Sequence, residues 1–353
     1  MLQEETLALL GRGREAWKAW TEERLAERDA LKAAGEWTAG WNEPDWNEAT
    51  RAWHATSFAD FSNHNFKDEA DFRSFVFPGG ARFDEATFSN DARFDGASFA
   101  GEVSFNAASF AGKTRFSKAN FSQDAWFCAA SFAGVVLFDD VSFSGEARFD
   151  KASFSSDAKL DGASFAGEAS FNAASFSGKA GFGKASFSQD AWFGAAHFAG
   201  VGLFDDVRFS GTAWFPEVRF SDRACFDSVV FASHAQFSDA DFGGVTVFDG
   251  AQFCDDAWFW EAKFQYGASF NKTRFGSNVS FPKKTKLGSR WVSGSSIPRG
   301  LLLVPWLIGL AVFVGILTET WVAVSPALAG GALFIGGVLT GIGLFGLWLE
   351  TES

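Results

Sequence analysis

The 353-residue sequence is poor in the residues on which small metal, disulfide and catalytic sites depend, with three Cys, four His, one Tyr and one Met. Cys128, Cys225 and Cys254 lie far apart and form no CxxC pair. This excludes a disulfide framework and a cysteine zinc site, and it favours a reducing compartment. The N-terminal segment carries charges where a signal peptide needs an apolar run, so we expect no export by a cleaved signal.

Catalytic constellations are missing as well. The acidic pairs 139–140 and 205–206 are copies of one turn in a duplicated segment, and we interpret them as solvated turns. The glycine pair 79–80 lacks the Lys and Ser/Thr of a phosphate-binding loop. We therefore expect no enzyme activity, no cofactor and no metal site. The histidines are scattered without metal-ligand spacing, at His54, His64, His197 and His234.

Phenylalanine is the residue in excess, with 45 in the chain. From Phe61 onward these residues recur at alternating intervals of five and six, and Leu160 is the one substitution in the series. The underlying unit is therefore eleven residues long. The stretches 94–159 and 160–225 are close copies displaced by six such units, which indicates duplication of a modular structure.

The repeat favours short strands over helices. A step of five residues turns a helix by roughly 140°, which scatters the rings around it, and Ser, Gly and Phe are poor helix formers. A small or β-branched residue lies two positions before almost every Phe, as Ala92 does before Phe94. In an extended strand these two side chains point to one face, and the residue between them faces solvent. Gly, Ser, Asn and Asp fill the intervals and predict turns.

This pattern resembles the pentapeptide-repeat family, in its Phe-centred branch, over residues 55–282. The resemblance implies an all-β solenoid, a right-handed quadrilateral β-helix with four strands per coil. The alternation of five and six departs from the strict five of the family, so one coil takes two eleven-residue units and the repeat predicts about ten coils. We place the extra residue of the longer interval at a corner; it is often charged, as in Glu102, Lys113, Asp124, Glu146, Glu168 and Lys179.

Residues 1–54 predict a helical, Trp-rich N-terminal cap over the first coil. We expect one helix over 3–34, followed by a segment that holds Trp37, Trp41, Trp46 and Trp53. Such a cap would cover the unpaired strand edges at this end of the solenoid. The alternative is a helix that binds a partner.

The C-terminal part predicts a membrane anchor. Residues 283–300 form a basic juxtamembrane linker, and 301–317 and 324–350 are apolar runs that fit two transmembrane helices, together the hairpin 301–350. By the positive-inside rule the β-helix lies in the cytoplasm, and the chain is an integral membrane protein, as in a bacterial inner membrane. The candidate lipid-contacting residues are Lys283, Lys284, Lys286, Arg290 and Arg299.

Small residues on the second apolar run are candidates for close helix packing. They serve either packing within the hairpin or homo-oligomerisation, and the sequence does not separate the two. They are Ala332, Gly336, Gly337, Thr340 and Gly341.

One outward column is a candidate partner-binding site. Trp126, Trp192, Trp214 and Trp258 each precede a Phe, and their separations are all multiples of the expected coil length. They should therefore lie in one column, and exposed Trp beside Arg is typical of binding hot spots. The competing interpretation is duplication and chance. The column also contains Arg82, Ser104, Arg148, Ser170, Gln236 and Ser280.

Three function classes follow. The leading hypothesis is a membrane-anchored, non-catalytic scaffold or protein-binding module, whose protein partner the sequence does not identify. The alternative is a DNA-mimic inhibitor of a topoisomerase such as gyrase, a role that some family members perform and that the net charge of −13 favours. The same charge argues against nucleic acid as a ligand. A third class is a membrane-active, oligomeric effector.

Overall fold

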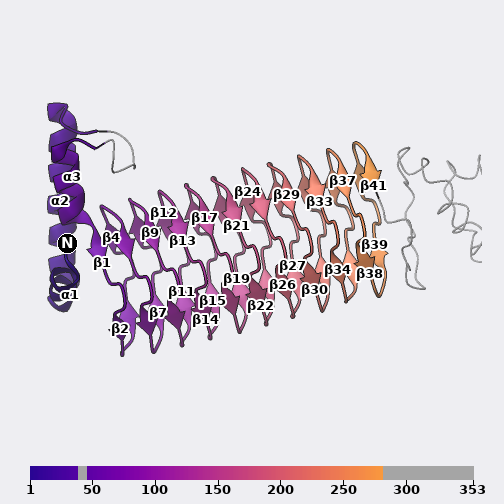
Figure 1. Cartoon of the computed structure of the whole chain (residues 1–353), viewed down its shortest axis with the longest axis horizontal. Coiled ribbons are helices and arrows are strands. Elements are labelled where there is room, and N and C mark those ends of the chain that lie inside the picture. Colours follow the sequence, from indigo (N-terminus) through magenta and orange to yellow (C-terminus); the bar gives the residue numbers. More distant parts are fainter. Residues whose placement is uncertain (39–45, 281–353) are drawn as a thin grey trace, which may run out of the picture.

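The computed structural model describes residues 1–38 and 46–280 of the chain. Three helices come first, α1 (Gln3–Gly11), α2 (Arg14–Ala34) and α3 (Glu48–Ser57). Two-residue strands follow, from β1 (Ala59–Asp60) to β41 (Val279–Ser280). Figure 1 shows the strands stacked as successive coils along one axis, with the helices at the end where β1 lies.

The strands form four parallel sheets, one of eleven strands and three of ten. Each strand pairs with the strand four positions later, so β1 lies beside β5 (Ala81–Arg82) with Ala59 opposite Ala81. This pairing joins positions two eleven-residue units apart and confirms the predicted coil length. The four strands of the first coil are β1, β2 (Asn65–Phe66), β3 (Ala70–Asp71) and β4 (Val76–Phe77). The predicted count of about ten coils is confirmed, and β41 begins an eleventh.

The interior holds the alternation that the sequence predicts. Ala92 and Phe94 are fully buried, whereas Arg93 between them is partly exposed. Rings stack from coil to coil, with the centroids of Phe94 and Phe116 4.7 Å apart and their planes at 7°. Across the core, Phe94 meets Phe105 edge to face at 5.5 Å and 86°. Full burial of each ring contributes about 1.5–3 kcal/mol, and each coil packs only on its neighbours, so stability grows nearly additively along the axis.

The corners within the five-residue intervals, which we call the shorter corners, are tight turns. In the turn after Phe94, the Ala97 N–H donates to the Phe94 carbonyl at 3.0 Å, and Gly96 adopts a φ of +62°. The same turn position is left-handed in every shorter corner of the described β-helix, most often with a residue other than Gly, such as Ala107 (+55°) or Lys118 (+60°). The stacked coils therefore hold these residues in a conformation that costs an L-residue about 1–2 kcal/mol.

The longer corners hold the extra residue, as predicted. Glu146 directly precedes β17 (Ala147–Arg148), and its N–H donates to Asp124 Oδ1 of the previous coil at 2.8 Å. Lys113 is bound by Asp91 in the same way at 3.0 Å. Aspartates at these corners thus accept hydrogen bonds from backbone N–H groups that have no partner in the strand pairing.

Two predictions for the N-terminal region are wrong in detail. The single helix expected over 3–34 is broken, because α1 ends at Gly11 and Gly13 adopts a φ of +90°, which a helix cannot contain. The cap also extends beyond residue 54, since α3 continues to Ser57 and packs on α2.

The helices cover the exposed edge of the first coil. Trp17 Nε1 and Thr21 Oγ1 both donate to the Val76 carbonyl, at 3.0 and 3.1 Å. The Asp60 N–H donates to Thr6 Oγ1 at 3.2 Å. Edge groups that would otherwise pair with another strand are therefore satisfied by side chains of α1 and α2.

Trp17 also closes the apolar core at this end. Its side chain is 2% exposed, and its ring lies 5.3 Å from both Phe75 and Phe77. Phe75 occupies a position that holds a small residue in most other coils. The larger ring reaches out of the first coil to contact the indole, so the cap is a structural part of the solenoid.

The predicted basic linker 283–300 and transmembrane hairpin 301–350 lie outside the described residues, as does Trp41. Within 1–38 and 46–280, no helix combines the length and the apolarity needed to cross a bilayer.

Candidate functional site

The predicted Trp column lies on the outer face of the eleven-stranded sheet, which we call the Trp face. Trp126 on β13 (Ala125–Trp126) is opposite Ser104 on β9 (Val103–Ser104) and Arg148 on β17. Trp192 on β25 (Ala191–Trp192) is opposite Trp214 on β29 (Ala213–Trp214). The row continues through β33 (Ala235–Gln236) and β37 (Ala257–Trp258) to β41, and β21 (Ala169–Ser170) lies between β17 and β25. The placement in one column is confirmed; partner binding stays a prediction.

Three of the four indoles on this face form two groups. Trp192 and Trp214 stack with centroids 4.8 Å apart and planes at 2°, and Trp214 Nε1 donates to Asp190 Oδ2 at 3.3 Å. Trp258 stacks on the His234 ring at 5.2 Å. Each of these side chains is half-buried, because one ring face is covered while another edge reaches solvent.

The two arginines of the column are held by acidic neighbours. Arg148 Nε lies 2.7 Å from Glu146 Oε1, and this hydrogen bond raises the pKa of the guanidinium. Arg82 lies 3.6 Å from Asp84 and over the Phe58 ring at 5.3 Å. Both side chains are about half exposed and remain accessible to a partner.

Beside Trp192 the face is hollowed. A concavity of about 330 Å³ is lined by Trp192, Ser170, Arg148 and the carboxylates of Glu146, Asp150 and Glu168. Ser170 is small and nearly buried, and its hydroxyl donates to Asp150 Oδ1. The floor of the hollow is therefore a short side chain, its walls are an indole and a guanidinium, and acidic groups exceed basic ones.

The family comparison bears on the same coils. A family model described as pentapeptide repeats (9 copies) matches residues 83–131, 129–175 and 226–274. These segments are similar to pentapeptide repeats. The resemblance predicted for 55–282 is thus confirmed over these stretches, which carry Trp126, Arg148 and Trp258 of the Trp face. Comparisons with curated proteins and with solved structures gave no match.

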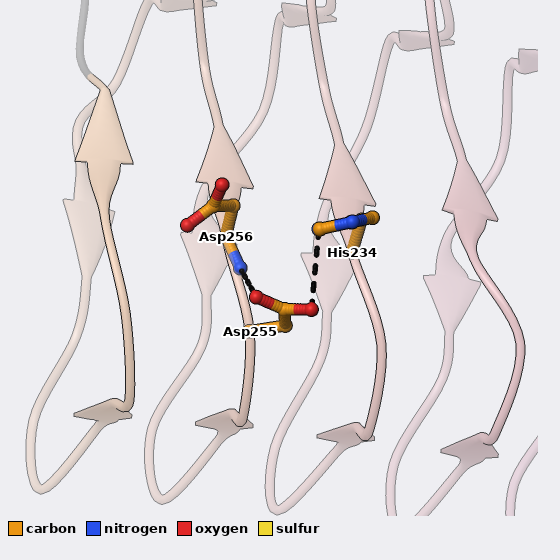
Figure 2. Close-up of side chains that lie close together, drawn as sticks. All are labelled: His234, Asp255 and Asp256. Carbon is orange, nitrogen blue, oxygen red and sulfur yellow. Dashed lines mark hydrogen bonds and ion pairs between the residues drawn. The ribbon is translucent and has the colours of Figure 1, made fainter.

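The stacked coils bring together one cluster that the sequence analysis missed. Figure 2 shows His234 beside Asp255 and Asp256, whose candidate ligand atoms all lie within 4.8 Å of one another. His234 Nδ1 is 3.5 Å from Asp255 Oδ2. One imidazole and two carboxylates are a donor set that suits a divalent transition metal. The signal in the sequence was the spacing, because the two aspartates follow His234 by about one coil.

Other bonds already use part of this cluster. Asp256 accepts hydrogen bonds from the Asn278 N–H and side-chain amide, both at 3.0 Å, and these bonds lower its pKa. The Asp256 N–H in turn donates to Asp255 Oδ1 at 2.9 Å. Asp256 therefore acts as a corner acceptor like Asp91 and Asp124, Asp255 accepts from the N–H of its neighbour, and His234 packs on Trp258.

The remaining candidate for chemistry is a hydroxyl–imidazole pair on the outside of the repeats. His197 Nε2 lies 2.9 Å from Ser221 Oγ, and both are exposed. Within the described residues no carboxylate is hydrogen-bonded to this imidazole, so the pair lacks the third group that orients a catalytic base. The acidic pair 139–140 lies in a turn, as predicted, with Asp140 at a φ of +56°.

Proposed function

We propose that the chain is a non-catalytic scaffold that binds a protein partner through the Trp face. The observation that carries this proposal is the alignment of half-exposed indoles and arginines on one rigid sheet. Trp and Arg dominate binding hot spots, and side chains fixed on a stiff surface lose little conformational entropy on association. The β-helix of pentapeptide repeats suits such a role, because its outer faces are flat and its core is closed.

The proposal includes a membrane anchor, for which the support is the sequence. The basic residues of 283–300 precede two apolar runs long enough to span a bilayer. An anchor at these runs holds the β-helix on the cytoplasmic side of the membrane. The Trp face is parallel to the axis of the β-helix.

Affinity capture tests the binding function. Full-length protein is captured from membranes in mild detergent, and co-purifying proteins are quantified for the parent and for Trp192→Ala combined with Trp214→Ala. We expect at least tenfold less partner with the variant and only a small decrease in melting temperature, because both indoles lie outside the core and lose little more than their mutual stacking. Leu203→Ala, on the outer face of β27 (Gly202–Leu203), is the matched control. Undiminished capture by the double variant would contradict the proposal.

Topoisomerase inhibition by DNA mimicry is the second candidate, and the net charge of −13 favours it. A DNA mimic needs rows of unneutralised acid, whereas Asp71, Glu69 and Glu146 are paired with arginines. A gyrase supercoiling assay with the full-length chain separates the two, since loss of supercoiling at micromolar protein would favour mimicry over the scaffold.

A further inference from the structure

Three residues that line the hollow beside Trp192 have counterparts earlier on the same face. Arg148, Ser170 and Trp192 lie on three successive strands of the Trp face. Three coils earlier, Arg82, Ser104 and Trp126 lie on three successive strands in the same order. We call each set an Arg–Ser–Trp notch.

The polar groups of the two notches match as well. Ser104 donates to Asp84 Oδ1, as Ser170 donates to Asp150 Oδ1. Asn106 and Asn172 accompany these pairs, and their N–H groups donate to the same carboxylates at 3.1 and 3.2 Å. The two notches therefore share the same Ser, Asp and Asn arrangement, whereas Gly80 stands in the first notch where Glu146 stands in the second.

The second notch presents one uncovered aromatic face. Trp214 covers one face of Trp192 at 4.8 Å, so the other face borders the hollow above Ser170. Elsewhere in the described chain, cations lie over the rings of Phe75, Trp37 and Phe58, and none lies over Trp126 or Trp192.

The charge around these faces is negative. Glu146, Asp150 and Glu168 outnumber Arg148 in the second notch, and the Arg148 guanidinium is engaged by Glu146 at 2.7 Å. Glu102 takes the place of Glu168 in the first notch. An uncovered indole face beside carboxylates attracts a cation, and a planar guanidinium fits it best because it stacks on the ring and pairs with a carboxylate at once.

We infer that each Arg–Ser–Trp notch binds an arginine or lysine side chain of the partner, and that the two notches together bind an extended segment with basic residues four positions apart. Three coils separate the notches by about 14 Å, and four residues of extended chain also span about 14 Å. This inference rests on the proposed function and names the chemistry of its partner.

The probe is the capped peptide Ac-Arg-Gly-Gly-Gly-Arg-NH2, titrated calorimetrically into the full-length chain in neutral detergent. We expect it to bind about tenfold more tightly than Ac-Arg-Gly-Arg-NH2, because only the longer peptide reaches both notches. Ac-Glu-Gly-Gly-Gly-Glu-NH2 is expected not to bind. Trp126→Ala and Trp192→Ala should each remove the tenfold advantage, and Leu203→Ala should leave it unchanged.

A variant that changes only the charge separates a loss of peptide binding from a loss of folding. Glu168→Gln keeps the shape of the second notch and is expected to weaken binding severalfold with an unchanged melting temperature. Equal affinity for both arginine peptides would overturn the two-notch spacing, and absence of binding would overturn the cation site.

The peptide and capture experiments fail independently. If the peptides do not bind while Trp192→Ala with Trp214→Ala still loses the partner, the inference falls and the proposed function stands. If the peptides bind while the double variant captures the partner undiminished, the cation site stands and the proposed function falls.

Discussion

Most phenylalanine rings of the β-helix are fixed by two kinds of neighbour at once, a parallel ring in an adjacent coil and an edge-to-face ring across the core. Phe116 and Phe138 are 4.8 Å apart with parallel planes, which is the spacing of paired strands. Ring stacking and backbone pairing thus share one repeat distance. This match is why a single aromatic residue can fill nearly every large interior position.

Leu160 interrupts one of these columns between Phe138 and Phe182, and it is fully buried. Leu160→Phe restores two parallel ring contacts, so we expect it to raise the free energy of unfolding by about 1 kcal/mol. Leu160→Ala leaves a cavity and should lower it by about 2–5 kcal/mol. Urea denaturation followed by circular dichroism measures both changes. Destabilisation by Leu160→Phe would show that the column narrows at this coil.

At this scale the sequence predicts most of the structure, because strand alternation is local. It places Ala92 and Phe94 inside and Trp126 outside from spacing alone. It does not predict the contacts among His234, Asp255 and Asp256, because these depend on side-chain conformations in neighbouring coils. Phe75 also departs from the repeat, for a reason that only its contact with Trp17 shows.

At the scale of the elements, the N-terminal helices cover the exposed edge of the first coil and so end the stack of coils. The sequence predicts a helical cap, and the structure confirms helices over the first coil. The break at Gly13 and the separate α3 were not predicted, although Gly11 and Gly13 interrupt the helix propensity of 3–34 and were a signal for the break. The helices on the two sides of the break pack on β1 and β4.

Trp17→Ala tests the cap. It removes an indole that is 2% exposed together with its hydrogen bond to Val76, and we expect a local loss of about 3–5 kcal/mol. Hydrogen exchange should accelerate in β1–β4 and stay unchanged beyond the next few coils, and the uncovered edge should promote aggregation seen by light scattering. Lys18→Ala on the exposed side of α2 is the control. Uniform acceleration along the whole β-helix would contradict nearest-neighbour stability.

His54 makes the cap sensitive to acid. Its ring stacks on Trp46 at 3.8 Å and meets Trp53 at 4.9 Å, and burial lowers its pKa from 6.5 to about 4. The unfolded imidazole binds its proton first, so the stability of the cap should fall as the pH drops from about 6.5 to about 4 and level off below.

Hydrogen exchange of α3 as a function of pH measures this effect. His54→Phe keeps an aromatic ring without a titratable group and should remove the dependence in that range. An unchanged profile in this variant would assign the acid sensitivity to other groups.

At the scale of the whole molecule, a coil consists of two eleven-residue units. The number of coils and the face on which a given side chain lies can therefore be changed separately. Removal of 138–159 deletes one whole coil and leaves Trp126 and Trp192 on one face. Removal of 149–159 deletes half a coil and moves every later strand to the opposite sheet, so the two indoles should lie on opposite faces. Both variants should fold, because each junction joins equivalent positions of the repeat.

Cross-linking distinguishes the two deletions. Cysteines are placed at 126 and 192 in a chain whose native cysteines are replaced, and a bis-maleimide is chosen that joins them in the undeleted protein. We expect an intramolecular product for the whole-coil deletion and none for the half-coil deletion. Equal amounts of the intramolecular product from both variants would show that the half-coil deletion does not move the later strands to the opposite sheet.

The nearest-neighbour contact of the coils also has a mechanical consequence. The described β-helix has no contacts between distant coils. When it is pulled at its C-terminal end, it should therefore unfold one coil at a time while the remaining coils stay folded. Each event frees one coil, or about 70 Å of extended chain, in exchange for about 5 Å of rod. The extension trace should be a staircase of small, nearly equal steps, so tension shortens the rod by increments and does not rupture it at once.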